Sequence, residues 1–533
     1  MTQVVPFPNP EVAQVEWSLL SIIFSICLCF NIVLTPLKAY ICEPLPWQIN
    51  SPPSILFDTN TSWNVKEEYF IHYYQEKYNR SDVENKYAVD NSESTTILWG
   101  EVPWPQQPDD CQIDLLPQLH GGVFFPTSLQ SELCVFFSGI ENTTSLARCY
   151  EPKIIDITIG ITCIWASLKR DSNSSFLPQD VTVFNTFRLT QTPLYLSLKM
   201  AYRVVLSLYI LYNMWTQYYK HYMPLARQCS SLPYIRCNII VGDPTSIFLL
   251  NPKICICLVI DIWLSSDVLA LEVLTVVHFS SWTQFFIGYM YLSRTVWFCY
   301  SFLSLASVAI KKRHWESKFT SVDPTMVAIA ATLVAGPFTY IQAHSILVKL
   351  YSWLFNVFAL TSHETETALG LFCYTSLIGQ LPLVYGFGYG YCRVKKQTPY
   401  SQLKHDQSFR NNDIKHRLLL GLETLFLGLP HGPRSSIHRV YNRYPSLKRS
   451  PCISQRGADC YLITYNEFDK VADVIRLTLL DIIDTTNRSP NIDLIMTKSC
   501  SVFGKAEIKV STNGTKKSCI IYTSKDSNCR WIE

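Results

Sequence analysis

Five long apolar segments between Leu194 and Tyr391 constrain the fold of this chain more than any other feature of its sequence. A bilayer core about 30 Å thick is crossed by roughly 20 apolar residues of helix. Segments of that length occupy residues 194–215, 254–274, 285–310, 325–344 and 368–391. A sixth apolar run, at residues 18–35, predicts a signal anchor, with a cleaved signal sequence as the alternative. The expected fold class is an α-helical polytopic membrane protein with about six transmembrane helices.

Charged residues in the loops predict the orientation of these spans. Lys and Arg occur in the loops at 216–253 and 311–324 and again just after the last span, whereas the loop at 275–284 has none. Because cytoplasmic loops retain positive charge, we expect residues 1–17 and the C-terminal tail in the cytoplasm. Residues 36–193 then lie on the lumenal or extracellular side.

A further apolar segment, at residues 346–361, is too short for a comfortable span. Gly336 and Pro337 interrupt the helix before it. We interpret this segment as an interfacial or re-entrant helix on the external side. The alternative is a seventh span, which would move the tail and its glycosylation sequons at Asn487 and Asn513 outside.

The composition fits this class. Hydrophobic residues make up 48% of the chain and charged residues 16%, which excludes a disordered chain and an ordinary soluble one. Residues 393–533 hold 23 Lys and Arg against 13 Asp and Glu. This basic tail suits the anionic lipids of the inner leaflet, although charge that only retains the tail inside explains the excess as well. We expect the lipid bilayer as a partner and no nucleic acid, and the pattern fits the plasma membrane and internal membranes equally.

The segment from 36 to 193 is expected to be a glycosylated domain of mixed α and β structure. It carries Asn-x-Ser/Thr sequons at Asn60, Asn79, Asn142 and Asn173. It also carries five cysteines that an oxidising compartment would allow to pair, at Cys42, Cys111, Cys134, Cys149 and Cys163. Five is an odd number, so at least one of them stays unpaired within the segment. Residues 155–162 alternate apolar and polar side chains, which predicts a strand.

The C-terminal part is expected to form a basic linker followed by a small domain. Within the linker, at 392–457, the leucine-rich stretch 418–429 predicts either an interfacial helix or a core helix of the tail, and 430–457 looks like a flexible tether. Residues 458–533 predict a small cytoplasmic α+β domain that folds without the membrane. Its expected strands are 460–464, 492–497, 506–512 and 515–522, the last two joined by a hairpin at Asn513-Gly514. Its expected helix carries an apolar face made of Phe468, Val471, Ile475, Leu479 and Ile482.

Six ionisable residues fall inside the predicted spans and are the candidate functional residues: Lys199, Arg203, Asp261, Asp267, Glu272 and Arg294. Arg203 and Asp261 are expected at similar depth and in contact. Asp261 and Glu272, eleven residues or three helical turns apart, are expected to share a face, whereas Asp267 is expected to point elsewhere. The six residues either pair with one another across the bundle or line a polar cavity for an ion, a proton or an anionic solute.

No catalytic motif is present, and the chain is not expected to be an enzyme or to hold a cofactor or metal. The glycines at 386, 388 and 390 in the last span predict close helix packing rather than a phosphate loop. The stretches 202–212, Gly242-Asp243-Pro244, 291–297 and Trp315-Glu316 upstream of Val322-Asp323-Pro324 resemble those of a group of uncharacterised multi-pass membrane proteins of oomycetes. This resemblance implies a polytopic architecture and no particular activity.

Two classes of function remain. The charges inside the spans favour a transporter or channel-like protein, although no duplicated half of the kind many transporters show is visible in the sequence. The alternative is a membrane receptor, sensor or scaffold with a glycosylated ectodomain and a cytoplasmic interaction domain. Its basis is the presence of a domain on each side of the spans.

Overall fold

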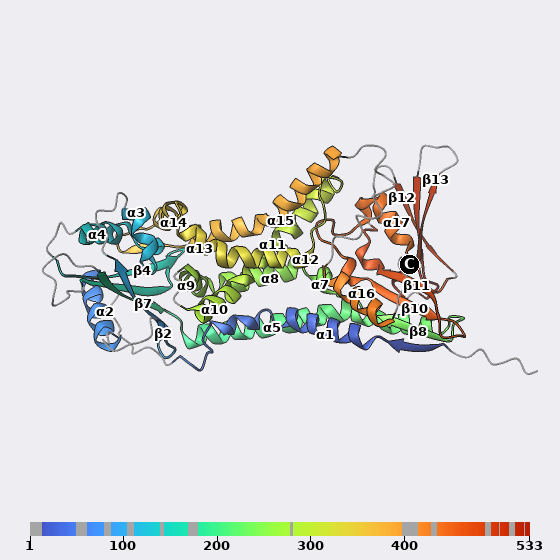
Figure 1. Ribbon diagram of the computed structural model, residues 1–533, viewed down its shortest axis with the longest axis horizontal. Coiled ribbons are helices and arrows are strands. Elements are labelled where there is room, and N and C mark those ends of the chain that lie inside the picture. The colour runs from blue at the N-terminus through green and yellow to red at the C-terminus, as the bar shows by residue number, and fades with distance from the viewer. Residues whose placement is uncertain are drawn as a thin grey trace, which may run out of the picture.

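The computed structural model describes residues 13–49, 61–78, 87–103, 111–138, 143–168, 180–277, 281–396, 414–427, 434–485, 492–499, 501–510, 517–526 and 528–533. The molecule is elongated and has three parts along its long axis (Figure 1). A helical bundle occupies the middle. A domain built mainly from residues 61–189, which we call the disulfide domain, lies at one end, and a β-rich domain that contains the C-terminus lies at the other.

The helical bundle contains four helices that are long and apolar enough to cross a membrane, or five if a bent pair counts as one. The candidate spans are Pro193–Cys229, Trp282–Lys312, Pro324–Ala343 and Ala368–Gly390, and the bent pair is Pro252–Trp263 with Ser266–Val277. The elements that form them are α5 (Pro193–Gln217), α6 (Tyr222–Cys229), α8 (Pro252–Trp263), α9 (Ser266–Val277), α10 (Trp282–Leu292), α11 (Val296–Lys312), α12 (Pro324–Leu333), α13 (Thr339–Ala343) and α15 (Ala368–Lys396).

Three of the predicted spans are interrupted. The span expected at 285–310 contains a 3₁₀ turn, Ser293–Thr295, between α10 and α11. The span expected at 254–274 breaks after Trp263, and α8 and α9 meet at an angle of 71°. The span expected at 325–344 contains a π-helical turn, Val334–Phe338, between α12 and α13. Pro337 lies in this turn, where its missing N–H removes one helical hydrogen bond, so the ladder widens locally rather than ending.

Two short helices accompany the spans. The run predicted at 18–35 forms α1 (Leu19–Val33), which is shorter than the four candidate spans and lies along α5 (Figure 1). The segment predicted at 346–361 forms α14 (Leu347–Asn356), which is not among the candidate spans. It packs against the disulfide domain, where Gln130 Nε2 of that domain donates to Ser352 Oγ of α14 at 2.7 Å.

One mixed layer of strands forms the centre of the disulfide domain. The order is β2 (Tyr87–Asp90), β3 (Thr95–Pro103), β7 (Asp180–Leu189), β6 (Gly160–Leu168), β4 (Ser145–Ile154) and β5 (Ile157–Thr158), with β9 (Glu364–Glu366) parallel to β4. The remaining pairs are antiparallel. The strand predicted at 155–162 is interrupted, because Ile155 and Asp156 adopt φ values of 50° and 61° in the turn between β4 and β5.

Helices cover both faces of this sheet. Successive residues of β6 alternate between two hydrophobic cores: Cys163 and Trp165 face α2 (Trp63–Tyr78), whereas Ile164 and Ala166 face the side of α3 (Cys111–Asp114) and α4 (Thr127–Ser138). This alternation is the period of two that a strand buried on both faces requires.

Segments distant in sequence form the C-terminal domain. Its first sheet has the order β1 (Gln14–Trp17), β8 (Arg236–Ile240), β10 (Cys460–Tyr465), β11 (Val471–Leu479) and β15 (Trp531–Ile532). Its second sheet has the order β12 (Ile492–Lys498), β14 (Lys517–Thr523) and β13 (Lys505–Val510), which confirms these three predicted strands. The first sheet is therefore not made by residues 458–533 alone. Its strand β1 comes from the N-terminal segment before α1, and its strand β8 comes from the segment between α6 and α8.

The helix predicted around residues 468–482 is wrong. Residues 471–479 form strand β11, antiparallel to β10, and Phe468 lies in the connecting turn with 79% of its side chain exposed. Asn466 caps this turn by accepting hydrogen bonds from the backbone N–H groups of Phe468 and Lys470. The sequence of β11, rich in Val, Ile, Thr and Leu, fits a period of two as well as the helical period, and pairing with β10 decides between them.

The linker carries more structure than predicted. Helix α16 (Ile414–Leu427) covers the leucine-rich stretch and buries Leu419 against the first sheet, while Leu418, Leu422 and Leu425 stay exposed. The segment predicted to be a flexible tether contains α17 (Ser436–Arg443), whose Ile437 and Val440 are buried against the second sheet.

Candidate functional site

Arg203 on α5 is the centre of a group of charged side chains inside the helical bundle. Its side chain is 0% exposed. Its Nη1 and Nη2 each donate to one carboxylate oxygen of Glu43 at 2.7 Å, and its Nε donates to Asp261 Oδ1 at 2.7 Å. Nη2 also donates to Ser265 Oγ at 2.8 Å. The contact predicted between Arg203 and Asp261 is therefore present, and a second carboxylate, from Glu43, joins it.

Two more cations complete this group. Lys199 Nζ lies 2.8 Å from Glu43 Oε2, and Arg294 Nη1 lies 3.4 Å from Glu43 Oε1. Arg294 Nη2 also donates to Asp261. Tyr291 donates its hydroxyl hydrogen to Glu43 at 2.7 Å. We define the buried charge cluster as Glu43, Lys199, Arg203, Asp261 and Arg294.

The five side chains of the buried charge cluster face one another rather than water. Each residue is at most 6% exposed. Arg203 lies ten residues into α5, about 15 Å along that helix. Charges removed from water at such depth cost several kcal/mol each unless partners compensate them. The cluster therefore joins α5, α8, the 3₁₀ turn Ser293–Thr295 between α10 and α11, and the segment after α1 through contacts that are costly to break.

The other two predicted acids lie apart from the cluster. Asp267, at the start of α9, accepts a hydrogen bond from Gln191. Glu272 lies beside Gly288, where an added Cβ would come within 2.8 Å of its Oε2. The expectation that Asp261 and Glu272 share a face is wrong, because the break between α8 and α9 turns the second half of this span away from the first.

Glu43 is the cluster residue that the sequence analysis missed. It follows the first apolar run, in the segment assigned to the external domain, yet it is 3% exposed. The neighbouring short helix, Leu37–Ile41, keeps the chain against the bundle after α1. Tyr40 adds a contact with Arg203, whose guanidinium carbon lies 4.9 Å from the tyrosine ring centre. The sequence held one signal for this role: Glu43 is a single acid in a mostly apolar stretch that contains Tyr40, Ile41, Cys42 and Leu45.

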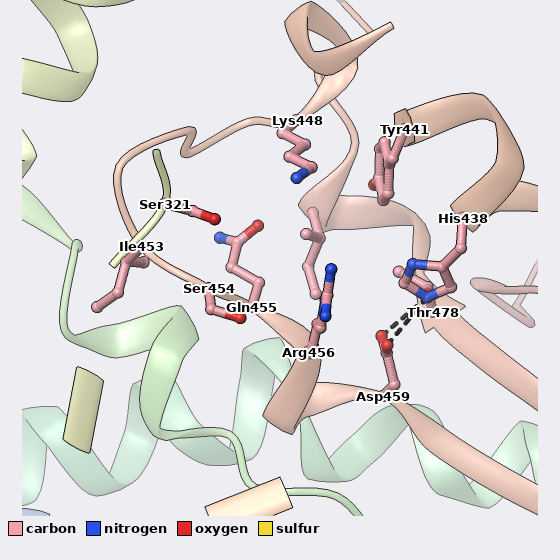
Figure 2. Close-up of a pocket in the computed structure, with 11 residues that line it drawn as sticks. Ser321, His438, Tyr441, Lys448, Ile453, Ser454, Gln455, Arg456, Asp459 and Thr478 are labelled. Atoms are coloured by element: carbon pink, nitrogen blue, oxygen red, sulfur yellow. Dashed lines mark hydrogen bonds and ion pairs between the residues drawn. The ribbon is translucent and has the colours of Figure 1, made fainter. Parts of the chain in front are cut away.

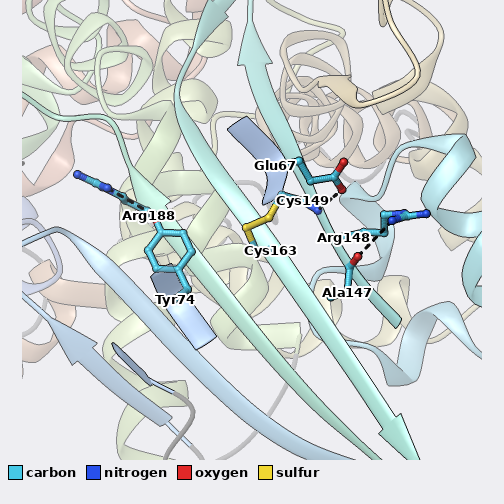
Figure 3. The surroundings of a disulfide bond; sticks show 7 residues. All are labelled: Glu67, Tyr74, Ala147, Arg148, Cys149, Cys163 and Arg188. Atoms are coloured by element: carbon cyan, nitrogen blue, oxygen red, sulfur yellow. Dashed lines mark hydrogen bonds between the residues drawn. A yellow bond between two sulfur atoms is a disulfide. The ribbon is translucent and has the colours of Figure 1, made fainter. Parts of the chain in front are cut away.

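Two disulfides join four of the five cysteines predicted as candidates. Cys111 pairs with Cys134, and Cys149 pairs with Cys163 across the neighbouring strands β4 and β6 (Figure 3). Cys42 is a free thiol. Next to the second disulfide, the backbone N–H of Cys149 donates to Glu67 at 3.0 Å (Figure 3). The predicted glycosylation residues Asn60, Asn79, Asn142 and Asn173, and also Asn487 and Asn513, lie outside the described residues.

The close helix packing predicted for the glycines at 386, 388 and 390 in α15 is wrong, although two of these glycines permit a close approach. A Cβ on Gly386 would meet the ring of Phe319 at 2.1 Å, and one on Gly390 would meet the carbonyl oxygen of Lys318 at 2.1 Å. Their neighbour is the loop before α12 and not another helix. Gly388 has nothing within 4 Å. In the described part of the chain, no three His, Cys, Asp or Glu side chains are grouped so that they could hold a metal ion.

No protein-family model, no curated protein and no solved structure matches this chain. The buried charge cluster and the two end domains are therefore the basis for a functional interpretation.

Proposed function

We propose that this chain is a multi-pass membrane protein that couples an external domain to a cytoplasmic domain, as a receptor, sensor or scaffold does. The observation that carries the proposal is the buried charge cluster. Its cations lie 2.7–3.4 Å from its carboxylate oxygens, and each residue is almost completely buried. Groups paired in this way hold helices in one arrangement, whereas a solute pathway needs ionisable groups that water or solute can reach.

The cysteines support this division into two sides. The disulfide domain contains two disulfide bonds, which form and persist in oxidising compartments. The cysteines described at the opposite end of the molecule are free thiols: Cys229, Cys237, Cys452, Cys460, Cys519 and Cys529. Lys311, Lys312 and Arg313 also lie at that end, at the close of α11. In our proposal, α1, α5, the bent pair, α10 with α11, α12 with α13, and α15 cross the membrane six times, and the C-terminal domain is cytoplasmic.

Glycan mapping tests this topology. Single Asn→Gln changes at Asn60, Asn79, Asn142 and Asn173 should remove glycans one at a time, because the proposal places these sequons on the oxidising side. The matching changes at Asn487 and Asn513 should leave the electrophoretic mobility unchanged. A glycan at Asn513 would contradict the six-span topology, because it would place the C-terminal domain outside.

Transport is the second candidate function, and the broken span favours it. Interrupted helices in transporters present backbone groups and side chains to a solute near the middle of the membrane. Here Ser265, at the break, accepts a hydrogen bond from Arg203, and Tyr195 donates to the freed carbonyl oxygen of Leu264. In this alternative, the buried charge cluster would be the closed state of a solute pathway.

A pair of measurements on the full chain distinguishes coupling from transport. With the chain in lipid nanodiscs, we expect reduction by dithiothreitol to change hydrogen exchange in β10 and β11, because only the disulfide domain has disulfides among the described cysteines. A variant with Cys111→Ser and Cys134→Ser already lacks one of the two disulfides. Its hydrogen exchange in β10 and β11 should therefore be partly changed before dithiothreitol is added, and dithiothreitol should change it less than in the native chain. Asp261→Asn should weaken the response, since it removes a charge from the link between the ends.

A measurement of ion flux tests the alternative that the chain is a transporter. Vesicles that contain the full chain should leak Na⁺, K⁺, Cl⁻ and protons no faster than vesicles that contain heat-denatured chain. A flux that disappears in Asp261→Asn, but persists in the exposed control Asp156→Asn, would overturn coupling in favour of transport. Unchanged exchange in β10 and β11 after reduction would contradict coupling whatever the flux.

A further inference from the structure

An apolar groove of about 470 Å³ lies where the disulfide domain meets the helical bundle. Three parts of the chain line it: the turn between β4 and β5, the segment from the end of α14 to the start of α15, and the end of α8. Its lining includes Ile155, Trp263, Phe358, Leu360, Glu366 and Phe372. No residue of the buried charge cluster is among its described lining residues, so the groove is a separate feature of the molecule.

The groove differs from the polar pocket around Asp459 in the C-terminal domain (Figure 2). In that pocket, Asp459 accepts hydrogen bonds from Arg476 Nε at 2.7 Å and from Thr478 Oγ1 at 2.8 Å. His438 Nε2 lies 3.0 Å from Asp459 Oδ2. The space that water can enter there is about 40 Å³, which is room for a few water molecules and not for a larger ligand. The open groove, by contrast, can take a large apolar group.

The apolar side chains around the groove are exposed to an unusual degree. Ile155 is 75% exposed, Phe358 63% and Leu360 73%, and all three line the groove. Ile157, just after the turn, is 70% exposed. A single exposed apolar residue needs no explanation, but several that surround one groove mark a surface that a membrane or another molecule covers.

The turn that carries Ile155 has an unfavourable backbone conformation. Strands β4 and β5 are joined by only two residues, Ile155 and Asp156, whose φ values are 50° and 61°. Such turns normally contain Asn, Asp or Gly, because a β-branched side chain is strongly disfavoured at positive φ. The chain therefore keeps a large apolar side chain at a position that is both strained and exposed. Backbone strain of this kind is concentrated at functional positions.

Glu366 fixes this turn to the first turn of α15. Its Oε1 accepts hydrogen bonds from the backbone N–H groups of Ile155 and Ala368, both at 3.0 Å. Its Oε2 accepts one from the N–H of Asp156 at 3.3 Å. One carboxylate thus holds the tip of the β4–β5 hairpin and the start of a candidate span together. Ile155 is therefore presented at a fixed position beside α15.

We propose, on the basis of the six-span topology above, that the external leaflet of the membrane covers this surface, with a phospholipid acyl chain in the groove and Ile155 inserted beside it. Trp263 belongs to the bent pair, and Phe372 belongs to the candidate span Ala368–Gly390. Phe372 is 57% exposed and lies four residues into α15, about 6 Å along that helix. The groove thus continues the apolar outer surface of the spans, which lipid covers.

The charged groups near the groove fit this position. The carboxylate of Glu366 is held by three backbone N–H groups. Lys153 Nζ, on β4, lies 2.7 Å from Glu364 Oε1, so these two charges neutralise each other. The side chain of Asp156 is exposed and stays in the water at the level of the lipid headgroups. None of these charges has to enter the hydrocarbon for Ile155 to do so.

Photo-crosslinking in nanodiscs tests the proposal. The photoreactive residue p-benzoylphenylalanine replaces Ile155 or, in a second variant, Phe358 of the full chain in phosphatidylcholine nanodiscs. After irradiation, we expect intact mass spectrometry to show an adduct of one phospholipid at either position. Phe358 exchanges one exposed aromatic residue for another, so this variant keeps the test decisive if the change at Ile155 disturbs the turn.

Two control positions separate this proposal from the topology on which it rests. Val384, in the middle of α15 and 70% exposed, should give a lipid adduct if α15 spans the membrane at all. Val135, an exposed residue of α4, should give none, because α4 lies at the end of the disulfide domain remote from the bundle (Figure 1).

A polar turn tests whether the hairpin tip itself is inserted. Ile155→Asn with Ile157→Thr keeps residues that tolerate positive φ and a strand, respectively, but removes both apolar side chains. In this background, the lipid adduct at position 358 should fall severalfold. Val135→Thr, which also removes an exposed β-branched apolar residue from the disulfide domain, should leave that adduct unchanged.

Several results would overturn the proposal. Adducts at Val384 but at neither Ile155 nor Phe358 would leave the spans in the membrane and the groove outside it. An adduct at Val135 as abundant as that at Ile155 would show non-specific contact with lipid. A covalent dimer in place of the lipid adduct would assign the surface to a second copy of the chain. The absence of an adduct at Val384 would contradict the six-span topology as well.

Discussion

Replacing Glu43 by alanine should almost eliminate folded protein, although the sequence places this residue outside the predicted spans. Its carboxylate contacts Lys199, Arg203 and Arg294, and all three are nearly inaccessible to water. Without it, Asp261 alone would face three cations. Removing one partner of a buried pair typically costs about 3–5 kcal/mol, which is a large part of the stability of most domains. The yield of monodisperse protein in detergent and its unfolding temperature measure the effect.

A double variant and a surface control show whether the loss of stability in Glu43→Ala comes from the buried charge cluster. Adding Arg203→Met to Glu43→Ala removes a cation that has lost one of its two carboxylate partners, so the double variant should recover part of the lost stability, as coupled residues do. Glu132→Ala removes a carboxylate from an exposed pair, with Arg148 Nε at 2.6 Å, and should cost at most about 1 kcal/mol. If Glu43→Ala unfolds like Glu132→Ala, the buried charge cluster does not hold the bundle together.

The sequence predicted the bundle because its strongest signals are local. Apolar length marks a candidate span in four places, and three of the ionisable residues singled out inside the predicted spans, Arg203, Asp261 and Arg294, are in contact. These signals depend on the hydrophobicity of neighbouring residues and survive without knowledge of distant contacts. Three of the strands near the C-terminus, β12, β13 and β14, were also predicted from local patterns.

The partner of Arg203 could not be predicted in the same way. Glu43 is 160 residues away from it, and no local rule relates an acid after the first apolar run to a base within the next. The break between α8 and α9 is a similar case. Ser265 and the freed carbonyl oxygen of Leu264 are satisfied by Arg203 and Tyr195 of another helix, so the sequence of the broken span does not reveal what stabilises the break.

Long-range pairing also explains the error at residues 468–482. The apolar residues there fit a helix and a strand, and β10 decides by pairing with 471–479. In turn, β10 lies beside β8, which follows α6, and β8 lies beside β1 near the N-terminus. A segment from 458 to 533 taken alone lacks both neighbours. The structure therefore argues against the expectation that residues 458–533 fold alone, because β10 would lose its neighbour β8 and the sheet would lose β1.

Trp531→Ala and Phe468→Ala should have opposite outcomes, and this contrast separates the strand arrangement from a helix at 468–482. Trp531, two residues before the C-terminus, is 0% exposed, and its ring centre lies 5.0 Å from that of Tyr222. Its Nε1–H donates to the carbonyl oxygen of His221 at 2.9 Å. Phe468, by contrast, is 79% exposed in the turn between β10 and β11.

The two substitutions remove aromatic side chains from the same domain but from opposite environments. Losing a buried Trp or Phe typically costs about 3–5 kcal/mol, whereas surface changes usually stay within about 0.5 kcal/mol. Trp531→Ala should therefore lower the unfolding temperature of the full chain sharply and expose β8 and β10 to hydrogen exchange, because the cavity opens between the C-terminal domain and α6. Phe468→Ala should leave both measurements unchanged. The reverse order of effects would restore the helix at 468–482 and refute the sheet that joins β1, β8, β10 and β11.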